Sequence, residues 1–392
     1  MLTNIETIIF LLLLFMGVPD LCSQLGRPAL VYPVFALIGL AIAPFVNADV
    51  QTMLTGAGAV GFVLLLFEVG SEIELPRPKE LVRPFRMAGL LVALQYPIVL
   101  AAARVAGLAW PEALVAAAAL TSCSVGMAHA AWKNYPLPDD RTRALVLHVM
   151  VLLEIIAIIL LSVETVVLES GMSWRVPLKL IGIGITVVLV ARFSAHVKRL
   201  FQTVLAKTTR WRVHFLVALV LAVCALGERL GLSAAKTAFV LGLFTGHVQH
   251  GGKGLGDYMS PISHRFLIPL FFVALGMQLP WQSFLTASAL LALGVAGLLL
   301  GLREIIHRRW LKTGGGRTTA LLFSPNLTIV ALAASALFKH QPDSPTAAWL
   351  LMTGLFLTML SLFLLPRVAS GEAGVSSAGG AALVQNEGAK AN

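Results

Sequence analysis

The sequence predicts an all-α protein that crosses a membrane with about thirteen helices. Of its 392 residues, 58% are hydrophobic and only 12% are charged, whereas soluble proteins carry about 25% charged residues. Apolar runs of about 20 residues, the length that spans a bilayer as an α-helix, recur along nearly the whole chain. The composition therefore excludes a soluble globular domain, and we expect one membrane domain over residues 1–367.

The apolar runs follow one another with short connections. The first lacks the basic segment of a secretory signal sequence and has Glu6 before its core, so we expect a transmembrane helix there. Residues 368–392 are rich in Gly, Ala and Ser, which predicts a disordered tail. The expected spans are residues 4–18, 28–46, 51–73, 85–107, 111–132, 141–169, 176–199, 211–230, 233–249, 261–279, 283–306, 317–338 and 345–366.

Basic residues indicate the orientation of these spans. Lys and Arg gather at alternate connections, which by the positive-inside rule places the N-terminus outside and the C-terminus in the cytoplasm. The net charge of +10 is thus a sign of topology, and we expect no nucleic-acid partner. The three cysteines are scattered singly and predict neither a disulfide nor a metal site. With Arg303 set aside, the basic residues on the opposite side are Arg104, Arg175, Lys179, Arg229, Lys236 and Lys339.

Two of the expected spans contain residues that interrupt a helix. The fifth has the cluster Thr121, Ser122, Cys123, Ser124 and Gly126 near its middle, and hydroxyl side chains and glycine favour backbone that leaves the helix. The twelfth has Ser324-Pro325-Asn326 at a corresponding depth, where proline removes a helical hydrogen bond. Close helix packing and a simple proline kink are the alternatives for each span alone. Paired discontinuous helices in two halves are typical of a transporter's midplane binding site.

Glu154 is the one charged residue in the apolar stretch VLLEIIAIILL of the sixth span. A carboxylate at that depth costs at least about 2.5 kcal/mol, so it needs a cation, a water-filled cavity or a proton. One alternative is a permanently protonated glutamate with a structural role. The other is a carboxyl that exchanges a proton for a cation, because burial favours its neutral form and a bound cation favours the carboxylate.

Other charged residues near the spans are weaker candidates. Arg303 in the eleventh span is a possible charge partner of Glu154, or alternatively marks a cytoplasmic helix end. Glu68 lies near the cytoplasmic end of the third span, where we expect an entrance or gating role in preference to direct ion binding. Glu72 lies one turn beyond, in the membrane interface, and is a second candidate for the entrance or gating role.

Three sequence stretches together form a recognisable set. GFVLLLFEVGSEIEL is similar to the third-span pattern LLLFxxGLExD, with Glu72 at its glutamate, and TAFVLGLFTG to the ninth-span pattern AFxAGxxxA. FLIPLFFVALGMQL is similar to the tenth-span pattern FxxPLFFVxxGM. Through these stretches, residues 5–366 resemble the monovalent cation:proton antiporter-2 family of bacterial sodium/proton and potassium/proton exchangers.

The resemblance implies two inverted repeats whose broken fifth and twelfth helices cross near the midplane. It also implies that Glu154 is the ion-binding carboxyl, at a position where the family has aspartate after a polar residue. Here Leu153 precedes it, which suggests a single titrating carboxyl and electroneutral exchange. Arg303 matches the basic residue that pairs with the carboxylate in many members. The sequence FSPNLTIV keeps the twelfth-span break without the glutamate that the family has there.

The expected function is therefore exchange of Na⁺ or K⁺ for H⁺ across the inner membrane of a bacterium. Glu154 would bind proton and cation in competition, with oxygen ligands from Ser122, Cys123, Ser124 and Asn326. The resemblance also implies a homodimer, and neither an enzymatic activity nor a cofactor is expected. The alternatives are a symporter of the same fold that carries an organic anion and a membrane sensor or scaffold without transport.

Overall fold

The computed structural model describes residues 4–72, 78–134, 138–170, 211–229, 232–246, 248–250, 253–312, 315–341 and 345–366, with scattered positions between 176 and 203. Within these residues the fold is helical, apart from one antiparallel pair of two-residue strands, β1 (Gln249–His250) and β2 (Lys253–Gly254). Nine described helical segments are long and apolar enough to cross a membrane. The predicted fold class is confirmed. The count of about thirteen spans stays a prediction, because most of the span expected at 176–199 lies outside the described residues. The tail predicted at 368–392 also lies outside them.

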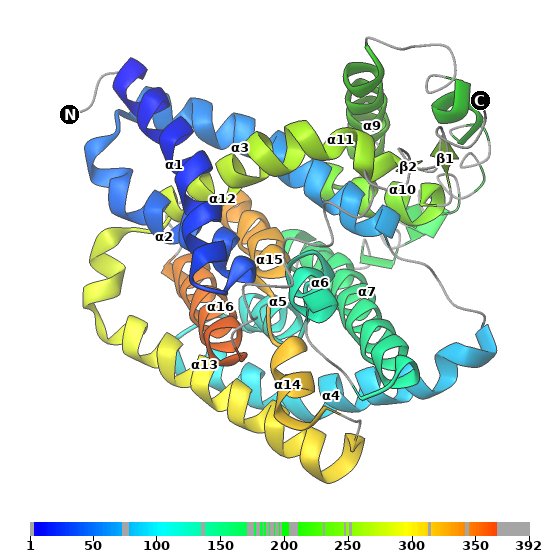
Figure 1. Cartoon of the computed structure of the whole chain (residues 1–392). Helices are drawn as coiled ribbons and strands as arrows, with labels where there is room; N and C mark the ends of the chain where they lie inside the picture. The colour runs from blue at the N-terminus through cyan, green and yellow to red at the C-terminus, as the bar shows by residue number, and fades with distance from the viewer. Residues whose placement is uncertain are drawn as a thin grey trace.

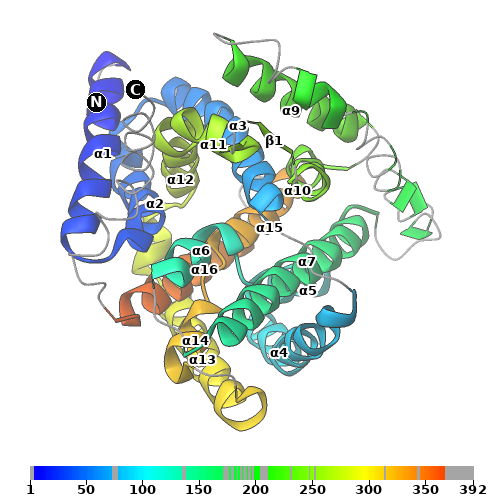
Figure 2. The ribbon, with the colours of Figure 1, turned by 45° about the vertical axis from the view of Figure 1, so that its right-hand side comes forward.

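One group of helices, here called the scaffold bundle, forms around α3. Helix α3 packs against α10 and α12, α12 packs against α2, and α10 packs against α9. Figure 2 shows these helices together along one side of the molecule. The bundle consists of α1 (Asn4–Gln24), η1 (Pro28–Leu30), α2 (Val31–Ile42), η2 (Ala43–Phe45), α3 (Ala48–Glu72), α9 (Arg212–Arg229), α10 (Ala234–Thr245), α11 (Leu255–Ile262), the π-helical turn η3 (Ser263–Leu267) and α12 (Ile268–Met277).

The other helices form a second group, here called the core bundle. Helices α4, α5 and α7 pack on one another, α16 packs on α13 and α15, and α15 joins the two sets by packing on α5 and α7 (Figure 1). The bundle consists of α4 (Pro78–Val105), α5 (Trp110–Leu120), α6 (Val125–Asn134), α7 (Asp140–Ser170), η4 (Trp281–Leu285), α13 (Ala287–Ile306), the π-helical turn η5 (His307–Leu311), α14 (Gly316–Leu322), α15 (Leu327–His340) and α16 (Pro345–Leu364).

Reciprocal glycines hold the scaffold helices at short range. A methyl group added at Gly70 of α3 would meet the backbone of α10, and one added at Gly242 of α10 would meet the backbone of α3. Gly39 of α2 and Gly276 of α12 are related in the same way. Because lipid supplies no hydrophobic drive between helices, close packing through small residues is a main source of their association. The scaffold is therefore a tightly packed unit.

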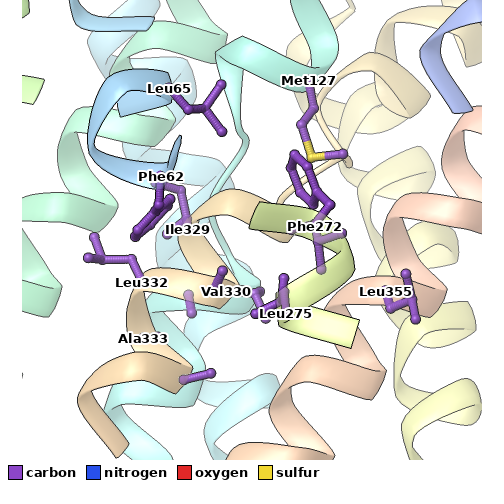
Figure 3. Close-up of a cluster of buried hydrophobic side chains, with 14 of the residues drawn as sticks. Phe62, Leu65, Met127, Phe272, Leu275, Ile329, Val330, Leu332, Ala333 and Leu355 are labelled. Atoms are coloured by element: carbon purple, nitrogen blue, oxygen red, sulfur yellow. The ribbon is translucent and has the colours of Figure 1, made fainter. Parts of the chain in front are cut away.

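The surface between the two bundles is apolar in its middle and polar near its ends. In Figure 3, side chains of α3 and α12 from the scaffold gather with side chains of α6, α15 and α16 from the core. At one end, Arg27 donates a hydrogen bond to the carbonyl of Leu362 at 3.1 Å. At the other, Lys236 of α10 contacts α7. The labelled apolar residues are Phe62, Leu65, Met127, Phe272, Leu275, Ile329, Val330, Leu332, Ala333 and Leu355.

Candidate functional site

The two predicted helix breaks are present, and they cross each other. Helix α5 ends at Leu120 and α6 begins at Val125, while α14 ends at Leu322 and α15 begins at Leu327. The backbone N–H of Ser124 donates to the carbonyl of Pro325 at 2.6 Å. Non-helical backbone at membrane depth must find its hydrogen bonds within the protein. The segments 121–124 and 323–326 satisfy part of that need through each other.

Asn326 ties the two breaks together through its side chain. Its Nδ2 donates to the carbonyls of Ala119 and Leu120, at 3.4 and 3.2 Å, which are among the last carbonyls of α5. Its backbone N–H donates to Thr358 Oγ1 at 3.1 Å. Its Oδ1 is buried and has no hydrogen-bond partner in the described part of the chain. Asn326 thus stabilises the crossing with its donors and leaves one oxygen available.

Glu154 lies on α7, fully buried, with its carboxyl group at the start of α6. Its Oε2 accepts a hydrogen bond from the backbone N–H of Val125 at 3.0 Å. The N-terminus of a helix carries a partial positive charge and unpaired N–H groups, so it stabilises a carboxylate there. Its Oε1 is buried without a hydrogen-bond partner among the described residues. Glu68 and Glu164 each have one such oxygen as well, but of the three only the Glu154 carboxyl accepts a hydrogen bond from the start of a broken helix.

Arg303 is buried on α13, and its guanidinium lies at the carbonyl ends of the broken helices. Its Nη1 donates to the carbonyl of Phe323 at 2.6 Å. Its Nη2 donates to the carbonyls of Leu120 and Ser122 at 2.8 and 3.1 Å, and its Nε donates to Gln95 Oε1 at 2.8 Å. The C-terminal ends of α5 and α14 carry partial negative charge, which a guanidinium offsets.

The expected direct pairing of Arg303 with Glu154 is not present. The structure describes both side chains, and no ion pair joins them. The physical reason is that the guanidinium already donates four hydrogen bonds, three to backbone carbonyls and one to Gln95. Arg303 lies in the last turn of α13, as the alternative of a helix end expects, but its side chain is only 2% exposed.

The hydroxyl cluster of the fifth span lies at the same crossing, largely in local hydrogen bonds. Ser122 Oγ donates to the carbonyl of Ala119 at 2.5 Å, and Cys123 Sγ donates to the carbonyl of Leu322 at 3.5 Å. Ser124 Oγ accepts a hydrogen bond from Thr328. All three side chains are fully buried. The structure therefore brings Ser122, Cys123, Ser124 and Asn326 to the crossing where Glu154 meets α6.

Glu68 belongs to a different site, in the scaffold bundle. Its Oε1 accepts a hydrogen bond from Ser263 in the π-helical turn η3, and its Oε2 lies 3.0 Å from His264 Nε2. Tyr32 Oη lies 3.0 Å from His264 Nδ1. Glu68 is 2% exposed, and its entrance or gating role stays a prediction. Glu72 is the last residue of α3, and its side chain lies outside the described residues.

Several polar partners at the crossing were not predicted from the sequence. Gln95 of α4, Thr328 of α15 and Thr358 of α16 are all buried and hydrogen-bonded there. Gln95 could have been found by the reasoning applied to Glu154, because it is an isolated amide in the apolar stretch LLVALQYPIVL. The threonines carry no such signal, since a hydroxyl in a membrane helix can satisfy itself on its own backbone.

Comparison with known proteins places this geometry in a family. A family model described as "Sodium/hydrogen exchanger, transmembrane" matches residues 10–369. The chain is similar to the "Putative Na(+)/H(+) antiporter YjbQ" of Bacillus subtilis (strain 168), with 23% identity over 363 residues, 85% of this chain and 58% of the relative. It therefore spans less than two thirds of that relative's length. It is also similar to the "Probable Na(+)/H(+) antiporter 3" of Methanocaldococcus jannaschii, with 23% identity over 270 residues, 67% of this chain and 68% of the relative.

Solved structures share the fold. The sodium proton antiporter MjNhaP1 from Methanocaldococcus jannaschii at pH 8 superimposes with a TM-score of 0.67 and 15% identity, covering 92% of this chain and 98% of that one. An electron-microscopy structure of the same antiporter gives a TM-score of 0.63 and 17% identity, covering 95% and 97%. The sequence resemblance is thereby confirmed at the level of the family. Because the family model matches most of its length, the chain belongs to the transmembrane sodium/hydrogen exchanger family.

Proposed function

We propose that the protein exchanges a monovalent cation, Na⁺ or K⁺, for H⁺, and that Glu154 binds the proton and the cation in turn. The observation that carries this proposal is the difference in surroundings between the two carboxyl oxygens of Glu154. One oxygen is anchored by the Val125 N–H at 3.0 Å, and the other is buried without a partner in the described chain. The anchored oxygen orients the group, and the other is available to a proton or an ion.

The surroundings of Glu154 suit a hard cation. Na⁺ and K⁺ are bound by oxygen ligands in proteins, and the crossing offers hydroxyls, backbone carbonyls and an amide oxygen. Asn326 Oδ1 is the second buried oxygen at the crossing without a partner among described residues. With Ser122, Cys123 and Ser124 from the opposite break, it would complete the coordination. The donors of Asn326 are occupied by α5, so its amide presents oxygen and not nitrogen.

A single carboxyl predicts electroneutral exchange. Leu153, which precedes Glu154, is a buried apolar residue and cannot hold a second proton. The site then alternates between a protonated Glu154 and a carboxylate with one bound cation, two forms of equal charge. Burial favours the neutral acid and the cation favours the carboxylate, so the two ligands exclude each other. Arg303 supports this cycle by keeping the ends of α5 and α14 in place.

Movement of the core bundle against the scaffold bundle would give Glu154 access to either side. The contact surface is apolar in its middle, so a shift exchanges one set of apolar contacts for another.

We also propose that the chain lies in a bacterial inner membrane as a homodimer, with the N-terminus outside. Arginines and lysines at alternate connections support the orientation, and the homodimer rests on family resemblance.

Proteoliposomes test the proposal. A pH gradient is formed, Na⁺, K⁺ or Li⁺ is added separately, and dissipation of the gradient is followed for the wild type and for Glu154→Gln. We expect at least one cation to dissipate the gradient in the wild type and none in the variant. Glu164→Gln is the matched control, because Glu164 is a second buried carboxyl on α7 that also has one oxygen without a partner among the described residues. Its other oxygen is bonded to Tyr96, whereas that of Glu154 is bonded to the start of the broken helix α6.

Two results would contradict the proposal. Folded wild-type protein that dissipates no gradient with any of the three cations would exclude exchange, and labelled organic anions would then test the symporter. Equal activity of Glu154→Gln and wild type would remove Glu154 from the mechanism.

A further inference from the structure

Lys236 connects the scaffold bundle to the core bundle. It lies in the first turn of α10, is 8% exposed, and its Nζ contacts Thr165 Oγ1 at 3.1 Å and the carbonyl of Leu161 at 3.5 Å. A lysine near a helix N-terminus is unfavourable for its own helix, because the dipole there is already positive. The hydrogen bonds to α7 offset part of this cost.

The residues that Lys236 contacts lie on the face of α7 that carries Glu154. Leu161 and Thr165 follow Glu154 by seven and eleven positions, which brings both within about 20° of it around the helix axis. They lie about 10 and 16 Å further along that axis. Ile158 and Leu161, the apolar residues on this face between Glu154 and Thr165, are both buried. Lys236 thus lies over the continuation of the Glu154 face toward the end of α7.

This contact cannot persist if the two bundles shift. The carbonyl and the hydroxyl belong to α7 of the core, and the ammonium belongs to α10 of the scaffold. A bundle movement that opens this end of α7 must break a charge-assisted hydrogen bond at low exposure, which is among the stronger contacts available to a protein. The basic-residue pattern puts this end of α7 outside.

We propose that Lys236 is the residue that closes the outer end of the ion pathway by holding α7 to α10. This proposal rests on the proposed function, because it assumes an ion pathway that runs along the Glu154 face of α7. Lys236 is a positioning residue in this account: it does not bind the transported ion, and it sets how often Glu154 is reached from outside.

Native Cys123 reports on access, because it lies fully buried at the crossing beside the ion site. In a Cys22→Ala, Cys224→Ala background, Cys123 is the one thiol left. A membrane-impermeant methanethiosulfonate reagent is applied to right-side-out and to inverted vesicles, and the rate of modification is measured for each face. Loss of one charge-assisted hydrogen bond should change the open population about tenfold.

We expect Lys236→Met to raise the rate of Cys123 modification from the outer face about tenfold, with no rise from the inner face. Thr165→Val removes the hydroxyl partner with little change of shape and should raise the same rate by a smaller factor. The double variant should add nothing to Lys236→Met, because Lys236→Met already removes the contact that Thr165→Val breaks. Arg229→Met is the control, since Arg229 is an exposed basic residue on α9, expected on the same side.

An equal rise from both faces in Lys236→Met would mean that the protein is loosened in general and would overturn the proposal. So would an unchanged outer rate in both Lys236→Met and Thr165→Val. The labelling requires no ion exchange, so failure of the antiport proposal is read separately, from the gradient assay with Glu154→Gln.

Discussion

Glu154 and Arg303 act on opposite poles of the same helix crossing. Glu154 accepts a hydrogen bond from Val125 N–H at the start of α6, and Arg303 donates to the carbonyls of Leu120 and Phe323 at the ends of α5 and α14. Each charge lies at the helix termini whose partial charge opposes its own. The two residues therefore stabilise one crossing without an ion pair between them.

Replacement of Arg303 by Met should destabilise the fold. It leaves the carbonyls of Leu120, Ser122 and Phe323 and the Gln95 amide oxygen buried without this donor, at a cost of about 3 kcal/mol or more in the free energy of unfolding. Thermal unfolding of the purified protein measures it. Arg303→Lys keeps the charge but loses the planar set of donors, so its unfolding temperature should lie between those of the wild type and Arg303→Met.

The double variant Glu154→Gln, Arg303→Met decides between two roles of Arg303. If Arg303 holds the carbonyl ends, removing the Glu154 charge restores little of the stability lost in Arg303→Met. Recovery of most of that stability in the double variant would show that Arg303 serves mainly as the charge partner of Glu154.

Asn326→Ala should weaken cation binding. It removes a buried amide oxygen that has no partner among described residues, and we expect the cation concentration for half-maximal exchange to rise about tenfold. Thr358→Val is the control, because Thr358 supports only the backbone of Asn326, at 3.1 Å. If the cation concentration for half-maximal exchange is unchanged in a folded Asn326→Ala protein, the amide oxygen of Asn326 does not belong to the site.

Glu68→Gln should alter cation entry without abolishing exchange. Glu68 lies in the scaffold with Ser263 and His264, away from the crossing. We propose an entrance role, in which its negative charge raises the local cation concentration. The half-maximal cation concentration should then rise about threefold on the cytoplasmic side alone, with the maximal rate kept. Complete loss of exchange in a folded variant would instead make Glu68 part of the ion site.

Gly70→Leu should destabilise the scaffold bundle. A side chain at Gly70 would enter the backbone of α10, and overpacking of this kind costs about 1–3 kcal/mol. Gly56→Leu is the matched control on the same helix, since nothing lies within 4 Å of a methyl group added there. Thermal unfolding of both variants measures the difference, and equal midpoints would contradict the close packing of α3 on α10.

Part of this structure could be predicted from the sequence because its signals are local. Pro325 and the hydroxyls around Ser122 interrupt their own helices, and Glu154 in an apolar stretch identifies a buried carboxyl without knowledge of its neighbours. The breaks and the fold class were confirmed for this reason.

The remaining features depend on contacts between residues far apart in sequence. The donors of Arg303 reach carbonyls of two other helices, and backbone carbonyls leave no trace in a sequence. In the sequence, Lys236 is identified only as a basic residue on the outer side, because its partner on α7 is defined by the packing of the two bundles. The contacts of Glu68 could not be predicted from the sequence, because its partners, Ser263 and His264, come from a distant span.

Competition between proton and cation for Glu154 is the central claim, and proton release on cation binding tests it most directly. Purified protein in weakly buffered detergent solution is titrated with the transported cation at the pH of optimal exchange, and released protons are counted against bound cations. The account predicts release of up to about one proton per cation in the wild type and in Glu164→Gln, and none in Glu154→Gln. Cation binding to the wild type without proton release across the active pH range would contradict it.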